Sequence, residues 1–277
     1  MTWTAIARKD FRDAIRSRWL VALSVLFVLL VSVAVYLVRP APGRTASSNA
    51  LVNHFLVKDG LVTTLIPLIA LVMAYASVVG ERESGSLKLL LALPHSRADV
   101  VVGKVVGRTG AIAAAIGVGF LLPGVLLLVV PRLSFRPGYY LGYVILTALL
   151  AAVFVAIAVG FSAAMRSQRL AIGGAIGIYF LFVPLWGVVQ FPLQLALSLG
   201  GGPGWLPITG QELYRTLQLL NPTGSFKIVV NSFMSGKLFA AGARNSVRMQ
   251  VAATLMLVVW LLVPPLLGLV WFEQADL

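Results

Sequence analysis

The sequence contains no cysteine, which excludes disulfide bonds, thiolate catalysis and cysteine-based metal sites. Its only histidines are His54 and His95, and its apolar segments hold no His, Asp or Glu that could form a metal site or a catalytic triad. Only 11% of its 277 residues are charged, whereas soluble domains carry about 25%. These shortages argue against an enzyme, including one that acts within the membrane.

A nucleotide-binding motif is also missing. The Gly-Lys pairs, Gly103-Lys104 and Gly236-Lys237, are followed by aliphatic residues and have no glycine five positions earlier, unlike a P-loop. If ATP drives this protein, another chain must bind it. The apolar runs hold no ionisable residue, which disfavours a proton-coupled carrier. A sodium-coupled carrier is less strongly disfavoured, because carbonyl and hydroxyl groups can hold sodium.

Long apolar runs dominate what is present, since 59% of the residues are hydrophobic. About 20 apolar residues span a bilayer as a helix. The first run, 19–38, is longer than the apolar core of a signal peptide, so we interpret it as a membrane span. Prolines inside the runs are expected to kink their helices. The six predicted spans are 19–38, 61–80, 109–130, 139–165, 170–191 and 250–272, and the prolines are Pro67, Pro123, Pro184, Pro264 and Pro265.

The leader, residues 1–18, is amphipathic. Trp3, Ile6, Ala7 and Phe11 recur at helical steps with basic residues on the other side, which predicts an interfacial helix. The net charge of +13 lies mostly beside the apolar runs, so it indicates membrane-flanking charge and not nucleic-acid binding.

Basic residues also predict the orientation. With a cytoplasmic N-terminus, the inner segments carry 12 lysines and arginines and the outer segments 10, and the contrast is larger among the short loops. We therefore expect both termini to be cytoplasmic in a multi-pass protein of the cell membrane. The long outer segment, 192–249, is expected to contain one or two short helices at the outer leaflet, interrupted at Asn221-Pro222.

A dense polar stretch, 81–108, separates the second and third spans. Gly85 is expected to break the helix, and the leucines that follow have near-helical spacing up to Pro94. Ser96 and Asp99 have the spacing of a capping box that starts the next helix. From these residues alone, the short helix could lie on the membrane surface or dock a soluble partner.

The pattern Glu81-Arg82-Glu83, Gly85-Ser86-Leu87, Pro94, Ser96-Arg97 and Gly103-Lys104 resembles the first cytoplasmic loop of type-2 ABC exporter permeases. It is most similar to the NosY-like branch, the permeases of the nitrous oxide reductase maturation system. The order of leader helix, six spans and long outer segment is similar as well. The family more often has threonine where this chain has Ser86, which keeps a hydroxyl.

The resemblance implies a coupling helix that sits in a cleft of a separate ATPase subunit. Glu81, Arg82 and Glu83 would then be charges at the end of the second span, and Gly85 and Ser86 would allow the bend. Leu87, Leu90 and Leu91 would press into the ATPase or the permease body. ATP and magnesium are expected on the partner ATPase, with no cofactor on this chain. A role in maturing a copper enzyme is a further implication.

A permease of six spans is expected to work as a dimer, most simply a homodimer. Gly173-x-x-x-Gly177 in the fifth span offers close helix packing, either between subunits or within one. The polar residues inside the spans could line a pathway or bond to backbone carbonyls. These residues are Thr63, Thr64, Thr147, Ser162 and Gln190.

The sequence therefore predicts a single all-α membrane domain, 1–277. It has six transmembrane helices, an N-terminal amphipathic interfacial helix and a long outer segment before the last span. The predicted function is the permease subunit of an ATP-driven ABC exporter. An ion-coupled secondary carrier and a membrane scaffold that transports nothing are the alternatives.

Overall fold

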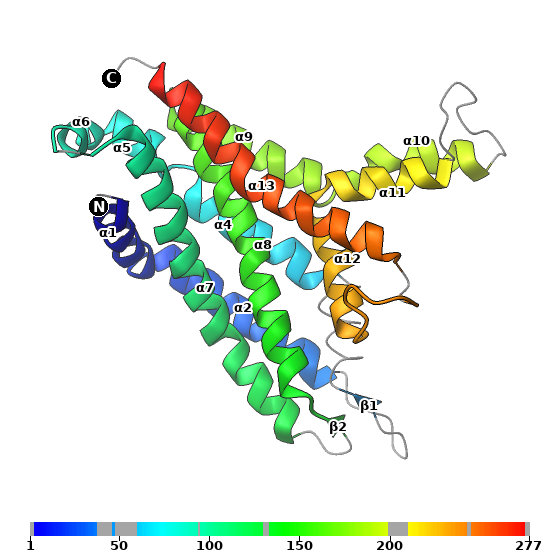
Figure 1. Ribbon diagram of the computed structural model, residues 1–277. Helices are drawn as coiled ribbons and strands as arrows, with labels where there is room; N and C mark the ends of the chain where they lie inside the picture. The colour runs from blue at the N-terminus through cyan, green and yellow to red at the C-terminus, as the bar shows by residue number, and fades with distance from the viewer. Residues whose placement is uncertain are drawn as a thin grey trace.

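The computed structural model describes residues 3–37, 46–47, 60–93, 95–129, 133–198, 210–242 and 245–274. Nearly all of these residues are helical, which confirms the predicted all-α membrane fold (Figure 1). The predicted stop at Pro94 and parts of the outer loops lie outside the described residues. The elements are α1 Trp3–Ile15, α2 Arg18–Leu37, β1 Ala46–Ser47, α4 Leu61–Ala74, α5 Val79–Glu83, α6 Ser86–Leu91, α7 Arg97–Val129, β2 Leu133–Ser134, α8 Pro137–Ala164, α9 Gln168–Phe182, α10 Trp186–Ser198, α11 Gly210–Leu220, α12 Pro222–Met234 and α13 Val247–Glu273.

Four helical segments are long and apolar enough to cross a membrane: Leu61–Glu83, α7, α8 and α13. Two bent helix pairs pass the same test, so the described residues hold up to six spans. The first pair is α1 with α2, bent by 63°, and the second is α9 with α10, bent by 51°. Pro184 lies in the α9–α10 break, whereas α4, α7 and α13 continue as helices through their prolines.

The core is built around α8, in which every residue from Leu150 to Gly160 is buried. A side chain at Gly160 would collide with the backbone carbonyl of Pro264 on α13. A side chain at Gly268 would meet the carbonyl of Gly160 in turn. The two helices therefore touch backbone to backbone, which only glycine permits at these positions.

The second span is interrupted between α4 and α5. The backbone N–H groups of Val78 and Val79 both donate to the buried hydroxyl of Ser162 on α8, at 3.1 Å each. Ser162 thus satisfies donors that a break inside an apolar environment would otherwise leave bare. The break is consequently fixed against the core helix.

The two ends of the molecule differ (Figure 1). The N- and C-terminal parts of the chain lie at the same end as α5 and α6. The opposite end carries the short parallel pair in which Ala46 faces Leu133 and Ser47 faces Ser134. Of the expected outer-segment helices, α12 packs on α13 and α8 with Phe226 and Val230 fully buried.

Candidate functional site

We call α6 and the turns on either side of it, from Gly85 to Asp99, the α6 hairpin. Its two turns have the residues and hydrogen bonds that the sequence predicts. Gly85 adopts a left-handed conformation with φ of 74°, and a Cβ there would have open space around it. Glycine is therefore favoured by the backbone conformation and not by crowding. At the other side of the hairpin, the backbone N–H of Ser96 donates to Asp99 at 3.0 Å, and that of Asp99 donates to the Ser96 hydroxyl at 3.0 Å. The predicted capping box is present.

The leucines of α6 divide between two faces. Leu87 is fully buried inside the subunit, and Leu90 and Leu91 pack partly against the same core. Leu89 and Leu93 instead have 74% and 55% of their surface exposed. Lys88 is exposed beside them. The apolar face that is open to a partner is therefore formed by Leu89 and Leu93, neither of which was among the predicted coupling residues.

Two of the three charges at the end of α5 hold neighbouring helices in place. Arg82 donates to the carbonyl of Met165 at 2.8 Å and to that of Ala163 at 3.3 Å, so it closes the C-terminal end of α8. Glu83 accepts a hydrogen bond from the backbone N–H of Gln168 at 2.9 Å, at the start of α9. A carboxylate is favourable at a helix N-terminus and a cation at a C-terminus.

The third charge, Glu81, belongs to a largely buried network that we call the Asp10 network: Asp10, Glu81, Lys104 and Arg108. Lys104 is only 2% exposed and lies 2.9 Å from Glu81 and 3.5 Å from Asp10. Arg108 binds Asp10 at 2.8 Å and also donates to the carbonyl of Met73. Two cations and two carboxylates thus balance, and they join α1, α4, α5 and α7.

The network depends on close contact between α1 and α7. A Cβ at Gly103 would lie 2.8 Å from Ile6, and one at Gly107 would lie 2.6 Å from the carbonyl of Ala7. These glycines let α1 lie directly on α7, so that Asp10 reaches Lys104. Sequence analysis missed Asp10, although it falls on the buried side of α1 with Ile6 and Ala7.

A second junction at this end involves Phe272 near the end of α13. The guanidinium groups of Arg82 and Arg97 lie over its ring, 5.2 and 5.1 Å from the centroid. Arg97 also donates to the backbone carbonyl of Glu273 at 3.0 Å and to that of Phe272. The end of α13 is therefore tied to α5 and to the start of α7.

The glycines proposed for helix packing face outward. Gly173 and Gly177 are exposed on α9, and a Cβ at either would meet nothing within the subunit. Gly174, by contrast, leaves room for the ring of Phe161 on α8. The outward face of α9 is thus open for a second subunit or for lipid.

The comparisons with known proteins agree with this architecture. A family model described as ABC-2 family transporter protein matches residues 4–277. The chain is 35% identical over 240 residues to a protein of Stutzerimonas stutzeri named "Probable ABC transporter permease protein NosY", covering 86% of this chain and 84% of the relative. A protein of the same name from Pseudomonas aeruginosa is 34% identical over 233 residues, covering 83% and 81%.

The fold and the α6 hairpin thus define a multi-pass membrane permease. The chain belongs to the ABC-2 family of transporter proteins. The predicted resemblance to NosY-like permeases is confirmed by both relatives. Within that family, the Asp10 network and the exposed face of α6 are the candidate coupling site.

Proposed function

We propose that this chain couples ATP binding on a separate ATPase subunit to the movement of a substrate through the membrane. ATP and magnesium would bind to the ATPase, which docks on the exposed face of α6. Closure of the ATPase would displace α6, and the charged junctions would pass this displacement to the spans. Both termini and α6 would then face the cytoplasm, and transport would proceed outward.

The observation that supports this proposal most directly is the combination of exposed leucines with buried charge. Leu89 on the short helix α6 and Leu93 just after it are exposed apolar residues outside the predicted spans. On the neighbouring α5, Glu81 pairs with Lys104 of α7, and Lys104 in turn contacts Asp10 of α1. Apolar exposure at such a position is typical of a docking surface. The ion pairs give that surface a rigid connection to three helices.

The first experiment is gentle extraction of the tagged full-length chain from its native membrane, followed by identification of co-purifying proteins. We expect a P-loop ATPase to accompany the wild type and to be lost from a Leu89→Asp, Leu93→Asp variant. Phe239→Asp is the matched control, because Phe239 is also an exposed apolar residue, 48% exposed, but lies after α12 at the opposite end. Its positive φ of 54° is tolerated by aspartate.

The result also separates the alternatives. If no ATPase accompanies a monodisperse wild type, and ATP changes nothing in reconstituted vesicles, a sodium-coupled carrier or a scaffold replaces this proposal. If the α6 variant retains its ATPase as well as Phe239→Asp does, docking occurs elsewhere.

We further propose that two copies pair through the outward face of α9, where Gly173 and Gly177 allow close approach. Similarity to the NosY-like branch supports a role in the maturation of a copper enzyme outside the membrane. A Gly173→Leu, Gly177→Leu variant should reduce the dimer fraction in crosslinking, whereas Gly117→Leu, another position with open space, should not.

A further inference from the structure

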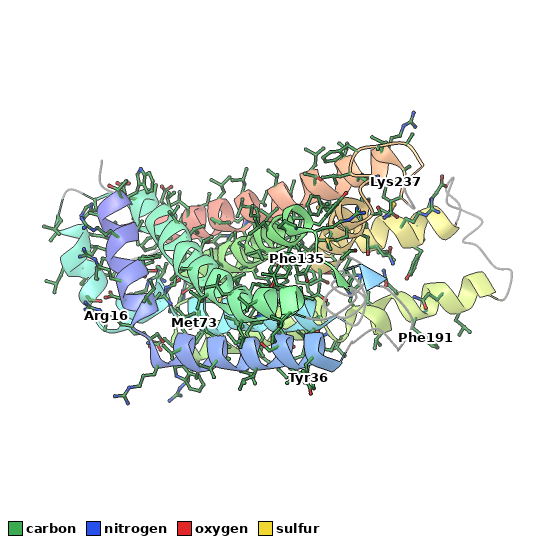
Figure 2. The ribbon with its side chains drawn as sticks, turned by 90° about the horizontal axis from the view of Figure 1, so that it is seen from below. Arg16, Tyr36, Met73, Phe135, Phe191 and Lys237 are labelled. Carbon is green, nitrogen blue, oxygen red and sulfur yellow. The ribbon has the colours of Figure 1, made fainter. Side chains whose placement is uncertain are left out.

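A cavity of about 800 Å³ lies at the far end of the molecule from α6, between the α9–α10 break, α11, α12 and the start of α13. In Figure 2, α10, which carries Phe191, and the yellow α11 lie on opposite sides of this region. Small-molecule sites commonly measure about 300–1,000 Å³ and are mostly apolar with a few polar groups. Phe182, Trp186, Ile228 and Met249 supply the apolar part of this wall.

The wall is held by bonds that do not depend on a ligand. The kink after Phe182 frees its backbone carbonyl, which accepts hydrogen bonds from Asn221 at 2.8 Å and from Thr223 at 3.3 Å. A side chain at Gly224 would collide with the carbonyl of Gln218, so glycine brings α11 and α12 together. The cavity is therefore preformed by the packing of α9, α11 and α12.

The charge in this cavity is of one sign. Lys227 and Arg215 line it, and no acidic side chain does so in the described part of the chain. In the sequence, Glu212 is the only acidic residue between Val100 and Phe272. Burial lowers the pKa of Lys227, and none of the described carboxylates forms an ion pair with it. The first turn of α12 also lines the cavity, and a helix N-terminus adds positive potential.

Two hydrogen-bond donors in the wall have no partner among the described residues. The side chain of Gln190 is 5% exposed, and its Nε2 is unpaired, as is Nε1 of Trp186. Thr63 and Thr147 donate to backbone carbonyls, and Ser162 accepts from backbone N–H groups. Buried hydroxyls without a partner also occur elsewhere in the described chain, but none of them lines the cavity: they belong to Ser32, Ser77, Thr109 and Tyr143. A buried donor without a partner is costly, so Gln190 and Trp186 point to an occupant that accepts hydrogen bonds.

We propose that this cavity is a binding site for an amphipathic anion, namely a phosphate ester with an apolar part. Lys227, Arg215 and Gln190 bind the phosphate oxygens, and Phe182, Trp186 and Met249 contact the apolar part. The same chemistry is offered by a phospholipid headgroup and by a soluble organic phosphate. This site goes beyond the proposed function, because its occupancy requires no ATPase and can be measured without one.

The test is calorimetric titration of the purified full-length chain in phosphate-free buffer. Dihexanoyl phosphatidic acid represents the lipid source and phenyl phosphate the soluble source. Dihexanoylglycerol lacks the anion, and inorganic phosphate lacks the apolar part. We expect one of the two esters to bind roughly tenfold more tightly than both dihexanoylglycerol and inorganic phosphate. Which ester binds identifies the source.

Variants separate binding from folding. Lys227→Gln should weaken the bound ester roughly tenfold, as the loss of one charge-assisted contact predicts. Lys237→Gln should not weaken it, because Lys237 is an exposed lysine outside the cavity wall that donates to the carbonyl of Gly242. Gln190→Leu should also weaken binding while leaving the melting temperature unchanged or raised, because no described partner is lost. A structural role for Gln190 would lower the melting temperature instead.

Three outcomes would overturn the proposal. Neither ester binds a monodisperse wild type, or dihexanoylglycerol or inorganic phosphate binds as tightly as the esters, or Lys227→Gln binds like the wild type. None of these outcomes depends on the ATPase. A failure of the cavity proposal can therefore be distinguished from a failure of ATPase docking on α6.

Discussion

The two ends of the molecule bury polarity in opposite ways. At one end, the two charged side chains that are buried in the described chain, Asp10 and Lys104, contact each other within the Asp10 network. Lys104 also pairs with Glu81, although Oε2 of Glu81 has no hydrogen-bond partner in the described chain. At the other end, the cavity holds the buried Gln190, whose Nε2 has no partner among the described residues, and the half-buried Lys227, which forms no ion pair with a described carboxylate. The paired groups hold neighbouring helices together, whereas the unpaired donors are available to bind a ligand. The comparison therefore separates a mechanical site from a binding site.

Asp10→Asn gives the strongest test of the stabilising role of the Asp10 network. Lys104 and Arg108 would then lose their shared carboxylate inside the protein, and breaking a buried ion pair costs about 3 kcal/mol or more. We expect the free energy of unfolding in detergent to fall by that amount. Asp13→Asn, on the exposed side of the same helix, is the control and should change it by less than about 0.5 kcal/mol. Equal effects would show that the network does not stabilise the fold.

A double-mutant cycle between Glu81→Gln and Lys104→Met should give the next largest effect. Their carboxylate and ammonium groups are 2.9 Å apart, and Lys104 is buried, so we expect a coupling energy of about 1–3 kcal/mol. The cycle between Glu81→Gln and Lys9→Met is the matched control. Lys9 is 58% exposed and 3.6 Å away, so its coupling should stay below about 1 kcal/mol. A coupling as large for Lys9 would contradict the role of burial.

At the cavity, a substitution should stabilise the fold instead of destabilising it, because Lys227→Met removes a half-buried amine that has no partner among the described residues. The pKa of Lys227 is lowered by burial, so its charge destabilises the folded state fully below that lowered pKa. We expect the variant to melt at a higher temperature than the wild type at neutral pH. The difference should shrink as the pH rises from the lowered pKa towards the ordinary lysine value, because the unfolded chain then binds more protons than the folded one.

Lys237→Met provides the control for this smaller effect, since Lys237 is exposed and close in sequence. Its melting temperature should follow that of the wild type across the same pH range. A lower melting temperature for Lys227→Met at neutral pH would mean that the amine has a stabilising partner, and the contrast between the two ends would then fail.

Local features of this fold could be predicted because they depend on neighbours in the sequence. Gly85 at the break, the Ser96–Asp99 capping box and the interruption at Asn221-Pro222 all follow from short-range chemistry. The all-α membrane fold follows from apolar runs of span length. These short-range signals are sufficient to predict the turn before α6 and the start of α7 from the sequence.

Long-range pairings could not be predicted in the same way. Asp10 and Lys104 lie far apart in the sequence and meet only because two glycines bring α1 onto α7. The outward face of α6 depends on how the hairpin rolls onto the core, which places Leu87 inside and Leu89 outside. The cavity depends on which helix N-terminus donates hydrogen bonds to the backbone carbonyl of Phe182, here that of α12 through Asn221. A hydrophobic pattern specifies none of these choices.

The junction at Phe272 has a consequence for how force would travel. Helix α13 is continuous from Val247 to Glu273, a rod of about 40 Å at 1.5 Å per residue. Arg97 is hydrogen-bonded to the C-terminal end of α13, and Met249 near the N-terminal end lines the cavity. A displacement of the start of α7 would then either break the hydrogen bonds between Arg97 and the end of α13 or move α13 along its axis. In the second case, the axial movement of α13 alone would carry a displacement from α6 and the start of α7 to the cavity wall.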